Sequence, residues 1–265
     1  MSDTENGVNK DTQQEPALPE PTASSPTTQP TRERETRAGA LKSSLTLELH
    51  THYAIRLWEG RRREDADDDL AKKQKDRTRF FRIFSMPQTI AVAGLANNDS
   101  SMDNPYADTL LVKLEDALEV SRQKIQSDVD ELSGVLKAIP QTLSLTDVRS
   151  VSPLNIGVYS RSPLGYRCVW LLVGYDQLAM KVFQAFHYGL ISRAQRDKYL
   201  DNNGYAVRRI YALVQSYRSF SVTRSDILSK TPVGIKAIER FGEPDLDVMS
   251  GHVRSSFSSP LRGGQ

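Results

Sequence analysis

Asn155, Tyr159 and Arg161 are the polar side chains of this sequence whose spacing best suits molecular recognition. Apolar residues occupy positions 154, 156 and 158, and this alternation predicts a strand with one apolar and one polar face. Arginine and asparagine side chains match the exposed edges of guanine and adenine. We therefore predict that these three residues contact base edges of DNA. A hairpin strand covered by helices gives the same pattern, and the pattern alone favours that simpler interpretation.

Basic side chains that could neutralise phosphates occur in two other places. The first is a densely charged run at 60–82, and the second is an amphipathic helix predicted at 205–220. Cations of this kind supply the sequence-independent part of DNA affinity. A solvated helix or linker whose opposite charges pair locally would have the same composition. The candidate phosphate contacts are Lys72, Lys73, Arg77, Arg79, Arg208 and Arg209.

His50 and His52 are two residues apart, so on a strand they would point to the same face and could hold a metal ion. Nickases of conjugative transfer use a histidine-hydrophobe-histidine motif with a tyrosine nucleophile, but the middle residue here is Thr51. His187 and His252 supply no clear third ligand. We therefore predict no metal site and expect hydrogen-bonded strand histidines.

Motifs for phosphate loops, dinucleotide binding, zinc proteases and serine hydrolases do not occur in the sequence. An SxxK match at 121–124 lies on an amphipathic helix without companion motifs, and we interpret it as chance. We expect no enzymatic activity, no cofactor and no small-molecule substrate. The one cysteine, Cys168, lies in an apolar helical run, where a small buried hydrophobe is expected.

The elements that must position these residues are mostly helices. Ser162 and Pro163 provide a cap and a first-turn proline directly after the predicted strand. Two apolar helices follow, so 153–193 has the plan of a ribbon-helix-helix DNA reader, in which strands of two subunits pair and enter the major groove. A second strand is predicted at 45–49, and 53–58 could continue it or form a helix. We also predict a loop at 97–103, a long helix from Pro105 to Pro140, and short helices at 225–229 and 232–241.

Composition divides the 265-residue chain into a polar N-terminal part and a globular remainder. Residues 1–38 carry seven acidic and four basic residues, so the rest has a formal net charge of +5. We predict a disordered tail at 1–38, a single globular domain at 39–249 and a flexible tail at 250–265. The predicted fold is mainly α with a small β component. No signal peptide or membrane span is apparent, and we expect a cytoplasmic protein without membrane contact.

Four blocks resemble an integrating-conjugative-element protein family related to the conjugation regulator AcaB. They are 44–61, 104–119, 162–193 (SPLGYRCVWLLVGYDQLAMKVFQAFHYGLISR) and 237–251, within a resemblance that spans about 40–261. The resemblance implies a dimeric, cytoplasmic DNA-binding regulator, related to ribbon-helix-helix proteins, that promotes conjugative-transfer genes. Its blocks are dominated by expected core residues such as Leu164, Trp170 and Leu171, so it assigns no individual DNA contact.

Besides a metal-dependent nickase that would use His50 and His52, the sequence is compatible with two functions. The first is a homodimeric transcriptional regulator that binds double-stranded DNA and serves an integrative and conjugative element or a conjugative plasmid. The second is a component of the transfer or maintenance machinery that does not bind DNA and uses the long helix as an interaction surface. The modest net charge keeps the second alternative open.

Overall fold

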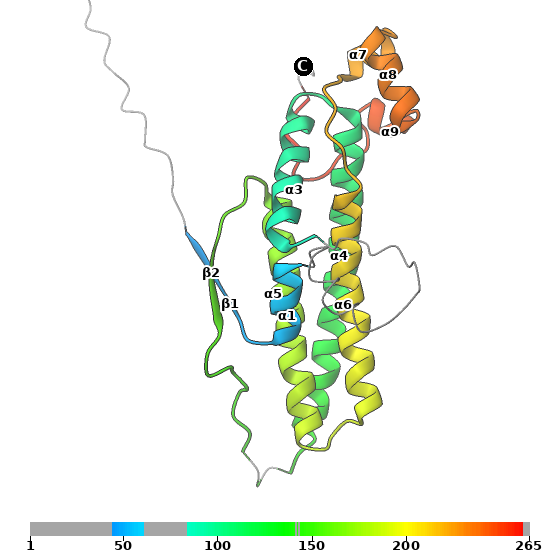
Figure 1. Ribbon diagram of the computed structural model, residues 1–265. Coiled ribbons are helices and arrows are strands. Elements are labelled where there is room, and N and C mark those ends of the chain that lie inside the picture. Colours follow the sequence, from blue (N-terminus) through cyan, green and yellow to red (C-terminus); the bar gives the residue numbers. More distant parts are fainter. Residues whose placement is uncertain (1–43, 61–83, 141, 143, 262–265) are drawn as a thin grey trace, which may run out of the picture. The chain divides into compact units, whose positions relative to one another are not determined.

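Helices make up most of the part of the chain that the computed structural model describes, which comprises residues 44–60, 84–140, 142 and 144–261 (Figure 1). A two-stranded sheet is the other regular element among these residues, so the predicted mainly α fold with a small β component is confirmed. In chain order the elements are β1 (Leu45–Leu49), α1 (His52–Glu59), α3 (Met86–Ser101), α4 (Pro105–Lys137), β2 (Leu154–Val158), α5 (Pro163–His187), α6 (Arg193–Gln215), α7 (Arg224–Leu228), α8 (Pro232–Phe241) and α9 (Leu246–Met249).

The long helices begin where the sequence predicts. Asn104 caps α4, because its side-chain oxygen accepts hydrogen bonds from the backbone N–H of Tyr106 at 3.0 Å and of Ala107 at 3.3 Å. Ser162 caps α5 in the same way through the N–H of Gly165 at 3.2 Å. Each cap is followed by a proline at the first helical position. The predicted α4 and the helix after β2 are therefore confirmed.

The predicted loop at 97–103 is wrong for most of its length, because residues 97–101 form the last turn of α3. A capping box of Ser85 and Gln88 starts this helix. Near its other end, Ser100 is buried, and its hydroxyl donates a hydrogen bond to the carboxylate of Asp108. This tertiary contact stabilises a turn whose residue types favour a loop.

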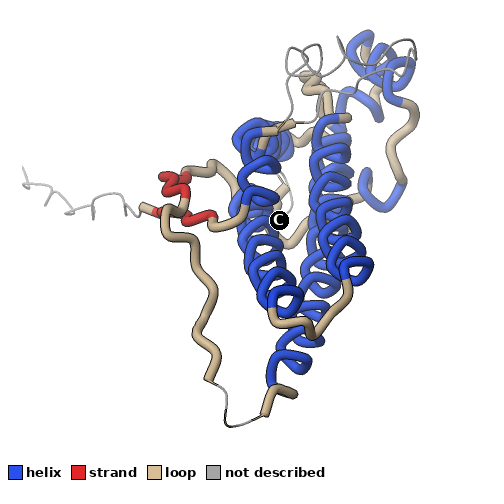
Figure 2. Tube along the Cα trace, turned by 60° about the horizontal axis from the view of Figure 1, so that its bottom comes forward, coloured by secondary structure: helices blue, strands red, loops and turns tan. Residues whose placement is uncertain are grey.

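The core lies between α3, α4, α5 and α6, which pack against one another along their lengths (Figure 2). An apolar stripe of α4, in which Leu118, Ile125 and Leu132 are seven residues apart, faces inward: Leu111, Leu114, Leu118, Ile125 and Leu132 are all buried. A methyl group added at Gly174 of α5 would lie 3.5 Å from Ile125, so the two helices approach closely there. The seven-residue spacing thus packs α4 within its own chain.

Cys168 is fully enclosed in this core, as predicted, and burial raises the pKa of its thiol to about 12. Because the thiolate is the reactive form, we expect a disulfide reagent at pH 8 to leave the native protein unlabelled. Labelling should become complete in denaturant and should follow the unfolding transition measured by circular dichroism. Rapid stoichiometric labelling of the native protein would contradict this placement.

The two predicted strands pair with each other in a two-stranded antiparallel sheet, with Leu45 opposite Val158 and Leu49 opposite Leu154. We call this sheet the hairpin or ribbon, although its strands are far apart in the sequence. Within 153–193 the chain forms β2 and the single long helix α5, so the prediction of two helices in this range is wrong; the next helix, α6, begins at Arg193. Within this chain the strand partner of β2 is β1. Strand β1 presents an alternating pattern that can meet β2 without another subunit.

A small second core holds α7, α8 and α9 together around Val222, Ile227 and Ala237. The segment after α9, placed by its composition in the predicted flexible tail, makes specific contacts with α4. The hydroxyl of Ser255 donates to Glu115 at 2.6 Å, and the guanidinium of Arg254 lies 3.2 Å from Asp108.

Candidate functional site

The outward face of the hairpin carries exposed polar positions from both strands. Thr46 and Glu48 on β1 lie opposite Gly157 and Asn155 on β2, and all four are exposed. The inward face is formed by buried leucines of β1, which pack on the helices. Thr46 and Glu48 were not predicted as candidate contacts from the sequence, although the alternation at 45–49 places them on the polar face. The polar outward face therefore comprises positions from both strands, whereas the sequence predicted contacts from β2 alone.

Tyr159 and Arg161 follow β2 and are both exposed, with Tyr159 at 74%. They line a hollow of about 920 Å³ together with Asn97, Asn98 and Ser101, which belong to the last turn of α3. Two of the residues predicted to contact DNA thus lie in one hollow, whose opposite wall carries the amide and hydroxyl groups of α3. These helix residues were missed because their stretch was predicted to be a loop.

The turn between β2 and α5 fixes the position of Arg161. Ser160 is buried, and its hydroxyl donates to the carbonyl of Ser162 at 2.8 Å and accepts from the N–H of Ser162 at 3.2 Å. Gly165 lies directly against this hydroxyl, since a Cβ there would stand 2.1 Å from it. These contacts therefore fix the backbone of the turn that carries Arg161.

The outward side of the hairpin carries both hydrogen-bond donors and hydrogen-bond acceptors. A two-stranded antiparallel ribbon fits the width of the major groove, and the guanidinium of Arg161 presents donors that match guanine. Glu48 provides an acceptor of the kind that cytosine can satisfy. The arrangement suits base-edge contacts better than phosphate contacts, because the outward face of the hairpin carries a carboxylate.

The structure does not bring the predicted phosphate contacts of α6 to the ribbon. Arg208 is half-buried, with a guanidinium nitrogen beside Gly204 near the hydroxyl of Tyr175. Arg209 is exposed and lines a separate shallow hollow with Lys113 and Asp116 of α4. Figure 1 shows α6 and the hairpin on different sides of α5. The other candidates, Lys72, Lys73, Arg77 and Arg79, lie outside the described residues.

The two histidines do not share a strand face, so this premise of the metal hypothesis is wrong. His50 follows the end of β1, and His52 is the first residue of α1. The side chain of Thr51 caps that helix through the N–H of Ala54 at 3.2 Å. The Nδ1 of His50 accepts a hydrogen bond from the N–H of Ser150 at 3.3 Å. Across residues 44–60, 84–140 and 144–261, no group of three histidine, cysteine or acidic side chains could hold a metal ion.

Comparisons with known proteins identify one family. A family model described as "Transcriptional regulator AcaB" matches residues 37–262. The crystal structure of selenomethionine-containing AcaB from uropathogenic E. coli is similar at a TM-score of 0.44 and 10% sequence identity, covering 80% of this chain and 96% of that one. The comparison with curated proteins gives no match. Within the described helices, none has the length and apolar character needed to span a membrane.

Proposed function

The chain belongs to the AcaB family of transcriptional regulators, and from this premise we propose that it acts by binding double-stranded DNA. Its targets are the conjugative-transfer genes of an integrative and conjugative element or a conjugative plasmid, which it activates. The observation that carries this proposal is the hairpin with a polar outward face, which ends in the exposed Tyr159 and Arg161.

In this proposal the hairpin enters the major groove, and its outward side chains read base edges. Asn155 and Arg161 are the principal contacts, and Tyr159 packs beside them. Thr46 and Glu48 extend the reading face onto β1. The buried leucines beneath hold the ribbon on the helices, so that little ordering is needed on binding.

Phosphate contacts come from outside the ribbon. We assign them to Lys72, Lys73, Arg77 and Arg79, which follow α1 in the chain. Of the two arginines on α6, Arg209 is exposed but lies away from the ribbon (Figure 1). Arg208 is the weaker candidate, because it is half-buried near Tyr175 and has less reach toward a ligand.

We also propose that the regulator is a cytoplasmic homodimer. The outer edge of β2 has no strand partner among the described residues, and its backbone groups can pair with the same edge of a second copy. Light scattering coupled to size-exclusion chromatography then gives twice the chain mass of 29.7 kDa.

Replacing Arg161 with alanine is expected to weaken specific DNA binding by about 1–3 kcal/mol, because a guanidinium that pairs with a guanine edge is lost. Fluorescence anisotropy with intergenic DNA of the mobile element and with a scrambled duplex measures the change. Arg79→Ala is the matched comparison, because Arg79 is one of the assigned phosphate contacts. It should weaken binding to both duplexes alike and lower the salt dependence by about one counterion.

Unchanged binding of folded Arg161→Ala and Tyr159→Ala variants would show that the ribbon is structural. The DNA surface would then have to lie elsewhere, with 72–82 as the first segment to test.

A component that contacts another protein instead of DNA is the second candidate. It is favoured by exposed apolar side chains on α7–α9, where Leu228 is 73% and Leu246 84% exposed. The same anisotropy experiment separates the two functions. A folded protein that binds neither duplex at low salt supports the second candidate.

A further inference from the structure

Trp170 is exposed, although its apolar helix predicts a core position. It lies on α5 with 66% of its surface exposed, whereas its neighbours Val169 and Leu171 are buried. Helical periodicity explains the difference, because position 170 lies on the side of α5 that borders an open groove between β1 and α4. An indole left on the surface loses the stabilisation that burial would give.

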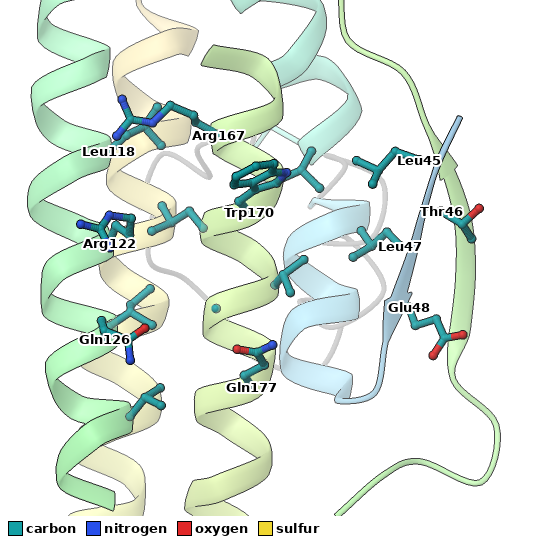
Figure 3. Close-up of a pocket in the computed structure, with 16 residues that line it drawn as sticks. Leu45, Thr46, Leu47, Glu48, Leu118, Arg122, Gln126, Arg167, Trp170 and Gln177 are labelled. Atoms are coloured by element: carbon teal, nitrogen blue, oxygen red, sulfur yellow. The ribbon is translucent and has the colours of Figure 1, made fainter. Parts of the chain in front are cut away.

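The indole stands over a groove of about 650 Å³ between β1, α4 and α5, which we call the sub-ribbon groove (Figure 3). This volume lies within the range of small-molecule sites. The apolar part of its lining is Leu45, Leu47, Leu118, Ile125, Val129, Val169, Trp170, Leu171 and Val173. Gly174 keeps the wall next to Trp170 free of a side chain, and polar groups are confined to a few positions.

Hydrogen-bond donors gather at one end of the groove. Figure 3 shows Arg122 and Arg167 together there, on the side where α4 faces α5. Glu119 lies between them and accepts from Arg122 at 2.7 and 3.2 Å and from Arg167 at 2.8 Å. Arg167 also lies 3.9 Å from the carboxylate of Glu115 and over the ring of Phe257. Because a guanidinium has five N–H donors, these contacts still use only part of what the two arginines can give.

The N–H groups of Arg122 and Arg167 that have no partner in the groove can donate hydrogen bonds to an oxygen atom of a ligand. Hydrogen bonds from Arg122 lower the pKa of Glu119 to about 2, so this carboxylate remains ionised and keeps the guanidinium in place at neutral pH. A carboxylate or sulfonate on a ligand can therefore meet N–H groups that are already oriented. Gln126 and Gln177 supply amide groups at the opposite end (Figure 3).

The groove and the proposed DNA face share one strand. Thr46, Leu47 and Glu48 of β1 all border the groove, but the side chain of Leu47 points toward the helices, whereas those of Thr46 and Glu48 point to the outward face (Figure 3). A molecule in the groove therefore packs beneath the ribbon and can shift its position relative to α5. A ligand changes an equilibrium only as far as it binds the two states differently, and this placement provides such a difference.

We propose that the sub-ribbon groove binds a small organic molecule with a flat apolar body and an anionic oxygen group. The body stacks on Trp170, and the anionic group binds Arg122 and Arg167. Its occupancy changes the affinity of the ribbon for DNA, and this regulatory part rests on the proposed function above.

The binding test uses 8-anilinonaphthalene-1-sulfonate, which has a flat apolar body and a sulfonate. The chain contains two tryptophans, so Trp58→Phe leaves Trp170 as the only indole donor. Saturable energy transfer from Trp170 to the probe is expected. N-phenyl-1-naphthylamine, which lacks the sulfonate, should bind about tenfold more weakly, as expected for loss of a charge-assisted hydrogen bond.

Arg122→Met should remove this preference for the sulfonate, because the substitution keeps apolar bulk and removes the donors. Trp170→Ala should reduce probe binding several-fold, with the fluorescence of the probe itself as the readout. Tyr205→Ala is the matched control, since Tyr205 is 64% exposed on α6 and does not line the groove. Equal binding of both probes, or no effect of Trp170→Ala, would overturn the proposed site.

The regulatory part is tested separately by measuring DNA affinity with and without saturating sulfonate probe. A several-fold change that disappears in Trp170→Ala supports it. Probe binding with unchanged DNA affinity would overturn the regulatory part and leave the site standing. A protein that binds the probe but no DNA would contradict the proposed function and not the groove.

Discussion

Replacing Asp108 with alanine is expected to lower the free energy of unfolding by about 3–5 kcal/mol. Asp108 is completely buried on α4 and holds two arginines from the C-terminal part of the chain. Its carboxylate lies 2.6 Å from the guanidinium of Arg224 and 3.2 Å from that of Arg254. Arg224 also pairs with Asp103 at 2.7 Å and donates to the carbonyl of Val248 at 2.9 Å. Removing the shared carboxylate leaves two poorly solvated cations facing each other.

Urea unfolding followed by circular dichroism measures this loss. Asp116→Ala is the matched control, because Asp116 is exposed on the same helix and the same side-chain change there should cost less than about 0.5 kcal/mol. Asp108→Asn should give an intermediate loss, since it keeps an acceptor and removes the charge. A loss for Asp108→Ala no larger than that of the control would show that the arginines find other partners.

Replacing Asp176 with alanine is expected to cost about 3 kcal/mol of stability and to weaken DNA binding as well. Asp176 is buried on α5, and its carboxylate accepts from the N–H of His50 at 2.8 Å and from the N–H and hydroxyl of Thr51 at 2.9 and 2.6 Å. Without it, two backbone donors at the junction of β1 and α1 lose their partner. The hairpin is then held less firmly on α5.

Hydrogen exchange at the amides of His50 and Thr51 checks this account directly, because both should lose protection in the variant. Asp201→Ala, at an exposed position of α6, serves as the control and should leave both amides protected. DNA affinity is compared at a temperature where both variants are folded. If the two amides keep their protection, Asp176 does not anchor the ribbon.

The strands and helix starts could be predicted from the sequence because their signals are local. Alternation over five residues identifies each strand, and Ser162-Pro163 and Asn104-Pro105 mark helix starts within a few residues of the first turn. The polar outward positions of β2 follow from the same alternation. These features depend on backbone geometry and near neighbours, so little information from the rest of the chain is needed.

Only the tertiary structure decided which of these pieces meet. The pairing of β1 with β2 joins segments more than a hundred residues apart, and the helical last turn of α3 depends on a bond between Ser100 and Asp108. The hollow at Arg161 exists because that turn lies beside the end of β2. Trp170 is exposed because the hairpin stands away from α5 there, which its apolar neighbours in the sequence do not reveal. Packing between distant segments sets each of these features, and no local pattern records which distant residue will be the partner.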